Sequence, residues 1–254
     1  MNGINRWRRA ARRCLTVLLA LGLLAGAAMG DGRGDLSERF ADVPRVVYGS
    51  ETYYLRGRLS SVMVAGLLPD ESDGMPRADF MAIFVIDDNE KRITPIYLDG
   101  MIAVEVRGGS LPLRAVCALG QDPMEGCAQL REVVNGLLGG DLIGSCLGID
   151  LDGITAVDGF GGIEGGARER LRQLHLLLQN IPSNQLNEMY GEISDYLITD
   201  LKSGAVMRML DKAERYEIAE AAELPTLPAE ELLIPDRDGI LELVIGVFCE
   251  AELL

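Results

Sequence analysis

The middle of the chain alternates between apolar runs and turns marked by glycine or aspartate. The first run has helical spacing and stops at Gly139-Gly140, because glycine adopts backbone angles that other residues resist. A short apolar run at 143–149 then predicts a buried strand. Asp150 or Asp152 can cap a second helix, whose apolar positions continue to Phe160. Helix, strand and helix in this order are typical of a three-layer α/β domain.

Further elements are predicted on both sides of this unit. Apolar and β-branched residues predict strands at 62–68, 80–86, 93–98 and 102–106, with an acidic turn at 87–90. Helical periodicity predicts helices at 168–181, 184–200 and 203–216. The segment 224–254 is predicted to form an extended arm followed by one amphipathic helix.

The N-terminus has the pattern of an export signal. Five arginines within residues 6–13 precede an uninterrupted apolar run at 14–29. This run is long for a signal-peptide core and shorter than the roughly 20 residues of a bilayer span. We expect either an anchor at 14–29 with the rest of the chain outside the cytoplasm, or cleavage near Ala27. Residues 31–44 are predicted to form a polar stalk.

Charge limits the partners of the exported part. The whole chain has a formal charge of −15, and residues 1–30 hold five arginines and no acid, so the remainder carries −20. A domain of this charge repels nucleic acid and anionic lipid surfaces. Membrane contact must therefore come from the N-terminal helix or from a buried lipid pocket. The whole chain is 48% hydrophobic, and its exported part is long enough to bury one full core.

Four of the five cysteines lie in the exported part. Cys117 and Cys127 flank a turn and could be bridged, because export permits disulfides. Cys146 in a core strand and Cys249 in the terminal helix are predicted to be buried, small hydrophobic residues. The only histidine, His175, is far from these cysteines in sequence, so we predict no zinc site.

Four ordered pieces of the central unit carry a resemblance to a known family. The pieces are Leu137-Leu138-Gly139, the strand up to Ile149, Asp150-Leu151-Asp152-Gly153 and Gly159-Phe160-Gly161-Gly162-Ile163. In this order they resemble the LytR-CpsA-Psr family of cell-envelope proteins, in its clostridial type. The resemblance implies a three-layer α-β-α LytR-CpsA-Psr-like domain with a central mixed sheet and helices on both faces.

The resemblance covers most of the chain after residue 45. Upstream, the segments Tyr53 to Gly66, Arg77-Ala78-Asp79 and Ala115 to Gly120 resemble family motifs. The segment from Leu224 to Phe248 resembles the C-terminal appendix of the clostridial branch. We therefore expect the domain at 45–223, with 224–254 as a C-terminal arm and helix packed on it.

The resembled family transfers a glycopolymer phosphate from a polyprenyl pyrophosphate carrier to peptidoglycan. Arginine forks neutralise phosphate oxygens, and carboxylates hold Mg²⁺ against the leaving phosphate. Carried over by position, Arg77 is a phosphate ligand and Asp79 is the Mg²⁺ carboxylate. Arg172 matches a family arginine, and Arg168 and Arg170 are near-substitutes for another arginine, whose position holds Glu169.

The same comparison finds losses at the phosphate-binding positions. Leu68 replaces a family carboxylate, and Gly100 and Met101 occupy the positions of a central arginine and aspartate. A loop that carries further arginines is missing before Ala167. Since each lost charged contact costs a buried phosphate site a few kcal/mol, we predict a degenerate active site.

Three hypotheses remain for the function. The first is a catalytically impaired relative that binds a polyprenyl-(pyro)phosphate-linked or cell-wall ligand. The second is an active phosphotransferase that attaches glycopolymers to peptidoglycan. The third is an exported structural domain without a ligand, which a filled core beside Arg77 and Arg168 would support.

Overall fold

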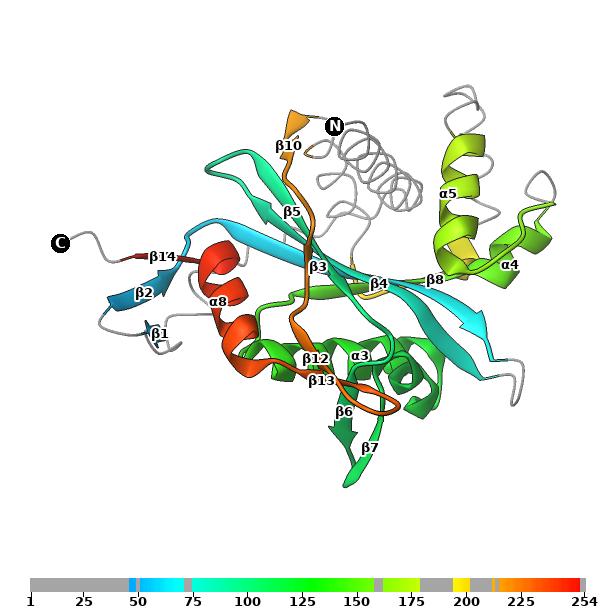
Figure 1. Ribbon diagram of the computed structural model, residues 1–254. Coiled ribbons are helices and arrows are strands. Elements are labelled where there is room, and N and C mark those ends of the chain that lie inside the picture. The colour runs from blue at the N-terminus through cyan, green and yellow to red at the C-terminus, as the bar shows by residue number, and fades with distance from the viewer. Residues whose placement is uncertain are drawn as a thin grey trace, which may run out of the picture.

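The computed structural model describes residues 46–48, 51–70, 75–157, 162–178, 194–201, 212 and 215–251. Within these residues, one large mixed sheet runs through the molecule and helices cover both of its faces (Figure 1). The expected mixed α/β fold with a central mixed sheet is confirmed.

Seven strands of the described chain form the sheet, in the order β10-β5-β4-β3-β8-β9, with β11 also paired to β5. They are β3 (Leu59–Pro69), β4 (Pro76–Asp87), β5 (Arg92–Leu98), β8 (Ser145–Asp150), β9 (Leu197–Thr199), β10 (Glu217–Ile218) and β11 (Ala222–Glu223). Strand β3 pairs antiparallel with β4 and parallel with β8. The parallel pair requires a long crossover, which returns through α3.

The two faces of the long strands bury different cores. On β3, Met63 and Ala65 face one cluster, whereas Val62 and Val64 face the other. Side chains alternate between the faces of a strand, so a strand buried on both faces needs a continuous apolar run. The sequence of β3 and β4 supplies this run, and it explains why both strands lie at the centre of the sheet.

One face of the sheet is covered by η1 (Leu113–Leu119), α3 (Pro123–Leu138) and α8 (Arg237–Phe248). Helix α3 begins at an Asp122 cap, whose carboxylate accepts from the Glu125 backbone N–H at 2.8 Å. It ends at Gly139, whose φ of 81° is the left-handed conformation expected of a glycine C-cap. The predicted end of this helix is confirmed, and its start lies earlier than the apolar pattern alone indicated.

The opposite face is covered by α4 (Leu151–Ala156) and α5 (Ala167–Leu178). Asp150 caps α4 by accepting from the Gly153 N–H at 3.0 Å, so of the two aspartates considered, Asp150 is the cap. Helix α4 ends at Ala156, earlier than predicted, and Phe160 lies outside the described residues.

Three small sheets surround the central one. Strands β1 (Val46–Tyr48), β2 (Glu51–Leu55) and β14 (Cys249–Ala251) form the first and join segments from the two ends of the chain. The hairpin of β6 (Ala103–Val106) and β7 (Gly109–Pro112) and that of β12 (Thr226–Pro228) and β13 (Leu233–Pro235) form the others.

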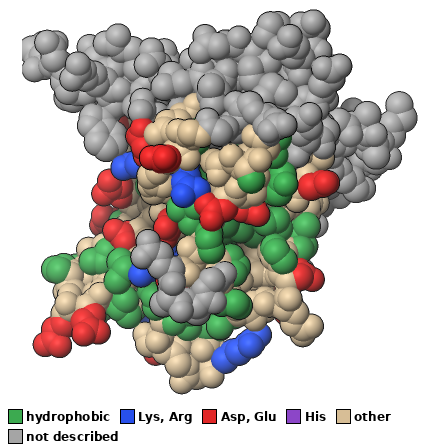
Figure 2. Space-filling model, turned by 90° about the vertical axis from the view of Figure 1, so that its right-hand side faces the viewer, with side chains coloured by type: hydrophobic (Ala, Val, Ile, Leu, Met, Phe, Trp, Pro, Cys, Tyr) green, Lys and Arg blue, Asp and Glu red, His purple; other side chains and the backbone are tan. Residues whose placement is uncertain are grey.

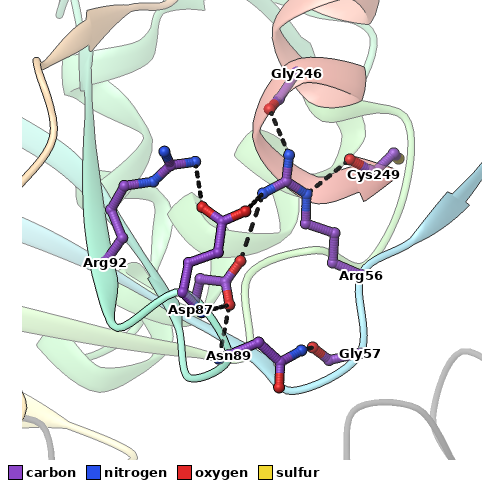
Figure 3. Close-up of polar contacts among 8 residues, drawn as sticks. Arg56, Gly57, Asp87, Asn89, Arg92, Gly246 and Cys249 are labelled. Carbon is purple, nitrogen blue, oxygen red and sulfur yellow. Dashed lines mark hydrogen bonds and ion pairs between the residues drawn. The ribbon is translucent and has the colours of Figure 1, made fainter. Parts of the chain in front are cut away.

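Arg56 binds the C-terminal end of α8 to the rest of the domain (Figure 3). Its guanidinium donates to the carbonyl oxygens of Gly246 and Cys249, at 3.4 and 2.8 Å. It also forms ion pairs with Asp87 at 3.5 Å and Glu90 at 3.1 Å, at the end of β4. Because a cation is favourable at a helix C-terminus, Arg56 holds α8 in place from a distant part of the sequence.

Two sequence predictions are corrected by the structure. The strand at 102–106 does not join the central sheet, because β6 pairs with β7 instead. The predicted helix at 184–200 does not extend to its expected end, because Leu197–Thr199 pairs with β8 as strand β9. Three parts of the predicted helices lie outside the described residues: Ile181, residues 184–193 and most of 203–216.

The N-terminal segments expected at 1–30 and 31–44 also lie outside the described residues. Within the part of the chain that is described, no helix has the length and apolar character needed to cross a membrane.

Candidate functional site

The candidate site lies where β3 and β8 end and β4 begins. The pairing of β3 with β4 changes register there: Gly66 lies opposite Phe80, and Leu67 lies opposite Ala78. Asp79 is therefore the extra residue of a β-bulge, and its side chain is exposed. Bulges bend a strand and change the direction of a side chain, and they are frequent near functional sites.

Arg77 lies two residues before Asp79, at the start of β4. Its Nε lies 3.4 Å from Asp70 Oδ2, and only 17% of its side chain is exposed. Its Cα partner across the sheet is Leu68, one of the positions at which the resemblance predicts a lost carboxylate. Arg77 is thus held partly buried by an acid of this chain.

Arg114 is a residue of this site that the sequence analysis missed. A Cβ built on Gly100 would lie 3.1 Å from Arg114 Cβ and 3.5 Å from its Cδ, so the arginine side chain packs directly on that glycine. The Arg114 N–H also donates to the Gly100 carbonyl at 3.0 Å. Its guanidinium lies 3.9 Å from Asp79 and is 43% exposed. The available signal was that Arg114 is the only basic residue between positions 108 and 130.

Arg168, at the start of α5, is positioned by an aromatic ring. Its Cζ lies 5.5 Å from the centroid of the Tyr97 ring, at the end of β5. Tyr97 in turn makes an edge-on contact with Phe80, with 6.0 Å between the ring centroids. A guanidinium above a ring face is attracted by the ring quadrupole, which fixes Arg168 near the start of β4.

Arg170 points away from this group. It pairs with Asp152 on α4, and its Nε donates to the Gly165 carbonyl at 2.7 Å. Arg170 thus joins α5 to α4, whereas Arg168 faces the other side of the helix. Arg172 follows in α5, but its side chain lies outside the described residues.

The structure therefore brings some of the predicted residues together and not others. Arg77 and Asp79 lie two residues apart at the start of β4, and Arg114 of η1 pairs with Asp79 from the face of the sheet that α3 covers. Arg168 packs on Tyr97 on the opposite face, which α5 covers. Figure 2 looks onto the side of the molecule where β3 ends, and it shows basic and acidic side chains interleaved with hydrophobic ones.

A divalent cation has few ligands at this edge. Among the described residues, no three His, Cys, Asp or Glu side chains are grouped so as to hold a metal ion. Asp79 is exposed and faces Arg114. Mg²⁺ can use one carboxylate together with the phosphates of a ligand, and only this arrangement fits the residues described here.

The space between the sheet and its helical cover is filled at Gly66. A Cβ at this glycine would lie 3.2 Å from the Cδ1 atoms of both Leu151 and Leu171. Helices α4 and α5 therefore pack directly against β3 here.

Comparisons with known proteins identify solved structures with a similar fold, but no matching family model or curated protein. No protein-family model matches the sequence, and no curated protein is significantly similar to it. Among solved structures, TagV of B. subtilis superposes with a TM-score of 0.52 at 13% identity, covering 76% of this chain and 97% of that chain. A Streptococcus agalactiae protein superposes with a TM-score of 0.53 at 12% identity, covering 74% of this chain and 86% of that chain. TagT, solved bound to LI-WTA, has a TM-score of 0.50 at 11% identity, covering 87% of this chain and 98% of that chain.

TagV and TagT are proteins of the LytR-CpsA-Psr family. The chain has a LytR-CpsA-Psr-like fold. At 11 to 13% identity this likeness concerns the fold alone. The clostridial type and the degenerate site stay predictions from the sequence.

Proposed function

We propose that this chain is an extracytoplasmic cell-envelope protein of the LytR-CpsA-Psr type, anchored by residues 14–29. It binds a polyprenyl-(pyro)phosphate-linked or cell-wall ligand, and its capacity for phosphoryl transfer is impaired. The proposal rests on the fold that the chain shares with TagV and TagT, and on Arg77 and Arg114, which pair with acids near the start of β4.

One observation carries the proposal. Arg114 packs on Gly100, the position at which the resemblance places the central arginine of the family. A cation from another element therefore stands beside the position of the lost one. Guanidinium groups bind phosphate oxygens through paired N–H donors, so Arg114 can restore part of the binding function.

Arg114 supplies a cation but no carboxylate, and the proposed impairment of phosphoryl transfer follows from the lost acids. Leu68 and Met101 stand where the resemblance expects a carboxylate and an acid, and the nearby acids Asp70 and Asp79 are paired with Arg77 and Arg114. Transfer needs charge to be neutralised more strongly in the transition state than in the bound ligand. Binding can therefore persist where the chemical step is slow.

The deciding experiment is equilibrium binding of a short-chain polyprenyl pyrophosphate to the full chain in detergent, with and without Mg²⁺. Arg114→Ala and Arg77→Ala test the site. Arg92→Ala is the matched control, because Arg92 is about as exposed as Arg114. Arg92 is the first residue of β5 and lies roughly 20 Å along this strand from the end that leads to Gly100. Since hydrogen bonds to charged groups contribute about 1.5–3 kcal/mol, we expect each site variant to weaken binding by roughly 10- to 150-fold.

The control variant should bind within about twofold of the wild type, because a surface ion pair contributes little. Equal losses in all three variants would mean that binding is nonspecific. A transfer assay beside TagT separates the remaining hypotheses. Transfer at a comparable rate would contradict the impairment and favour the active phosphotransferase.

A ligand-free structural domain is the second candidate, and the packing at Gly66 favours it. A Cβ at Gly66 would lie 3.2 Å from the Cδ1 atoms of Leu151 and Leu171, so the sheet and helices are tightly packed at this point. Absence of binding in every condition, together with intact folding, would support this candidate.

A further inference from the structure

Three cysteines from three different elements meet in the core. Cys117 lies in η1, Cys127 in α3 and Cys146 in β8. Each is at most 3% exposed, and all are free thiols in this structure. The sequence leaves a bridge between Cys117 and Cys127 open, and it predicts Cys146 to be a buried, small hydrophobic residue.

Two glycines explain how the three sulfur atoms come so close. A Cβ built on Gly126 would lie 2.3 Å from the Cys117 carbonyl oxygen, so η1 and the first turn of α3 are in backbone contact. A Cβ on Gly148 would lie 2.6 Å from Cys127 Sγ. Since alternate residues of a strand share a face, Cys146 and Gly148 both face α3, and the Cys127 sulfur lies beside Cys146.

Cys127 is the centre of the group. Hydrogen bonds link its sulfur to the thiols of both Cys117 and Cys146. The hydrogen bond from Cys117 and, to a smaller extent, the one from Cys146 lower the pKa of Cys127. Burial and the nearby Asp200 carboxylate raise this pKa. The hydrogen bond to Cys127 and burial raise the pKa of Cys117 and of Cys146. The two neighbouring thiols therefore stabilise the deprotonated form of Cys127, and the thiolate is the nucleophile in disulfide chemistry.

We propose that Cys127 is the shared partner of two alternative disulfides, one with Cys117 and one with Cys146, and that the third thiol interconverts them. This inference is independent of the ligand proposed above. Either bond would connect elements that are otherwise held by packing: Cys117 would join η1 to α3, and Cys146 would join α3 to the central sheet.

The oxidant is a low-molecular-weight disulfide that reaches the thiols when η1, α3 and β8 already lie together but still admit solvent. The Cys127 thiolate attacks one sulfur of the oxidant, forms a mixed disulfide and releases one thiolate. The neighbouring Cys117 or Cys146 thiolate then attacks the Cys127 sulfur and displaces the second. One S–S bond of the oxidant and two protein S–H bonds are lost, and one protein S–S bond and two small thiols are formed. Attack on Cys127 by the remaining thiol exchanges one protein disulfide for the other without a further oxidant.

The test is refolding of the full chain in a glutathione buffer rich in the oxidised form, followed by alkylation and peptide mapping. Cleavage after arginine leaves Cys117 and Cys127 in one peptide, so cleavage after Glu125 is needed to separate them. We expect two fewer alkylated thiols per chain than under reducing conditions, with Cys127 in every intramolecular disulfide.

Single variants assign the partners. Cys146→Ala should leave only the bond between Cys117 and Cys127, and Cys117→Ala only the bond between Cys127 and Cys146. Cys249→Ala is the control and should leave the map unchanged, because Cys249 lies at the end of α8. The proposal fails if the wild type keeps all its thiols, or if Cys117 is found joined to Cys146. The wild-type map decides these outcomes even if a variant does not fold.

Discussion

Two glycines of α3 show how a single residue type serves different purposes at different positions. Gly126 is buried, with the Cys117 carbonyl where its Cβ would be. Gly136 lies in the same helix, is exposed, and would have no atom within 4 Å of a Cβ. At Gly126 the missing side chain allows two elements to touch. At Gly136 it only weakens the helix.

This difference predicts opposite effects of the same substitution. Gly126→Ala should lower the free energy of unfolding by about 3 kcal/mol or more, because a backbone oxygen cannot easily move away. Gly136→Ala should raise it by roughly 0.5–1 kcal/mol, through lower entropy of the unfolded chain and better helix propensity. Urea denaturation of both variants measures the two changes. A loss of stability in Gly136→Ala would contradict the open surroundings described for that glycine.

At the scale of elements, α8 shows how a C-terminal helix becomes part of a domain. Its apolar face contributes Ile240, Val244 and Phe248 to the core shared with α3 and β3. Its first turn is capped by Asp236, which accepts from the Gly239 N–H at 3.3 Å. Its last carbonyls are bound by Arg56, from the turn before β3 (Figure 3). Both ends of the helix thus have partners for their backbone groups.

Removal of the Arg56 side chain should loosen this helix end. Arg56→Ala deletes the hydrogen bonds to two carbonyls and leaves the Asp87 carboxylate, which is almost fully buried, without this cation. We expect the free energy of unfolding to fall by about 1–3 kcal/mol, and hydrogen exchange to accelerate first in the last turn of α8.

Arg92→Ala is the control for this prediction, because Arg92 also pairs with Glu90, at 2.9 Å, but is 40% exposed. Its loss should cost less than about 1 kcal/mol and leave exchange in α8 unchanged. Equal effects of the two variants would show that Arg56 acts only as a surface charge.

At the scale of the whole molecule, the two ends of the described chain meet. Strand β14, which follows α8, pairs with β2 near the N-terminal end (Figure 1). Together with the contact between Arg56 and α8, this pairing makes the segment after residue 224 part of the same folded unit. The sequence analysis expects a domain at 45–223 with 224–254 as an arm and helix packed on it, and this division stays a prediction.

A truncation tests this view. A chain ending at Pro235 lacks α8 and exposes the side chains that Ile240, Val244 and Phe248 cover. Each buried apolar side chain contributes about 1.5–3 kcal/mol, and a whole domain is stable by only about 5–15 kcal/mol. We expect the truncated chain to lose cooperative thermal unfolding and to bind a hydrophobic dye. A chain ending at Ala251 retains α8 and β14 and should behave like the full chain; cooperative unfolding of the shorter chain would contradict the prediction.

Local patterns determined much of the fold. The end of α3 at Gly139, strand β8 and helix α8 were predictable, because each depends on residues close in sequence. An aspartate cap for α4 was also predicted, but only the structure identified Asp150 rather than Asp152 as the cap. The long apolar runs of β3 and β4 likewise required strands buried on both faces. The resemblance carried by the central motifs led to the fold that TagV and TagT share with this chain.

The tertiary structure alone decided the rest. Residues 102–106 and 197–199 have strand partners that no local pattern specifies. Strand β6 pairs with β7 outside the central sheet, whereas β9 pairs with β8 within it. Arg114 reaches Gly100 and Asp79, and Cys146 reaches Cys127, through contacts between elements. Such contacts depend on how helices and strands pack in space. Local sequence determined most of the elements, whereas packing decided the state of segments such as 197–199 and which side chains meet.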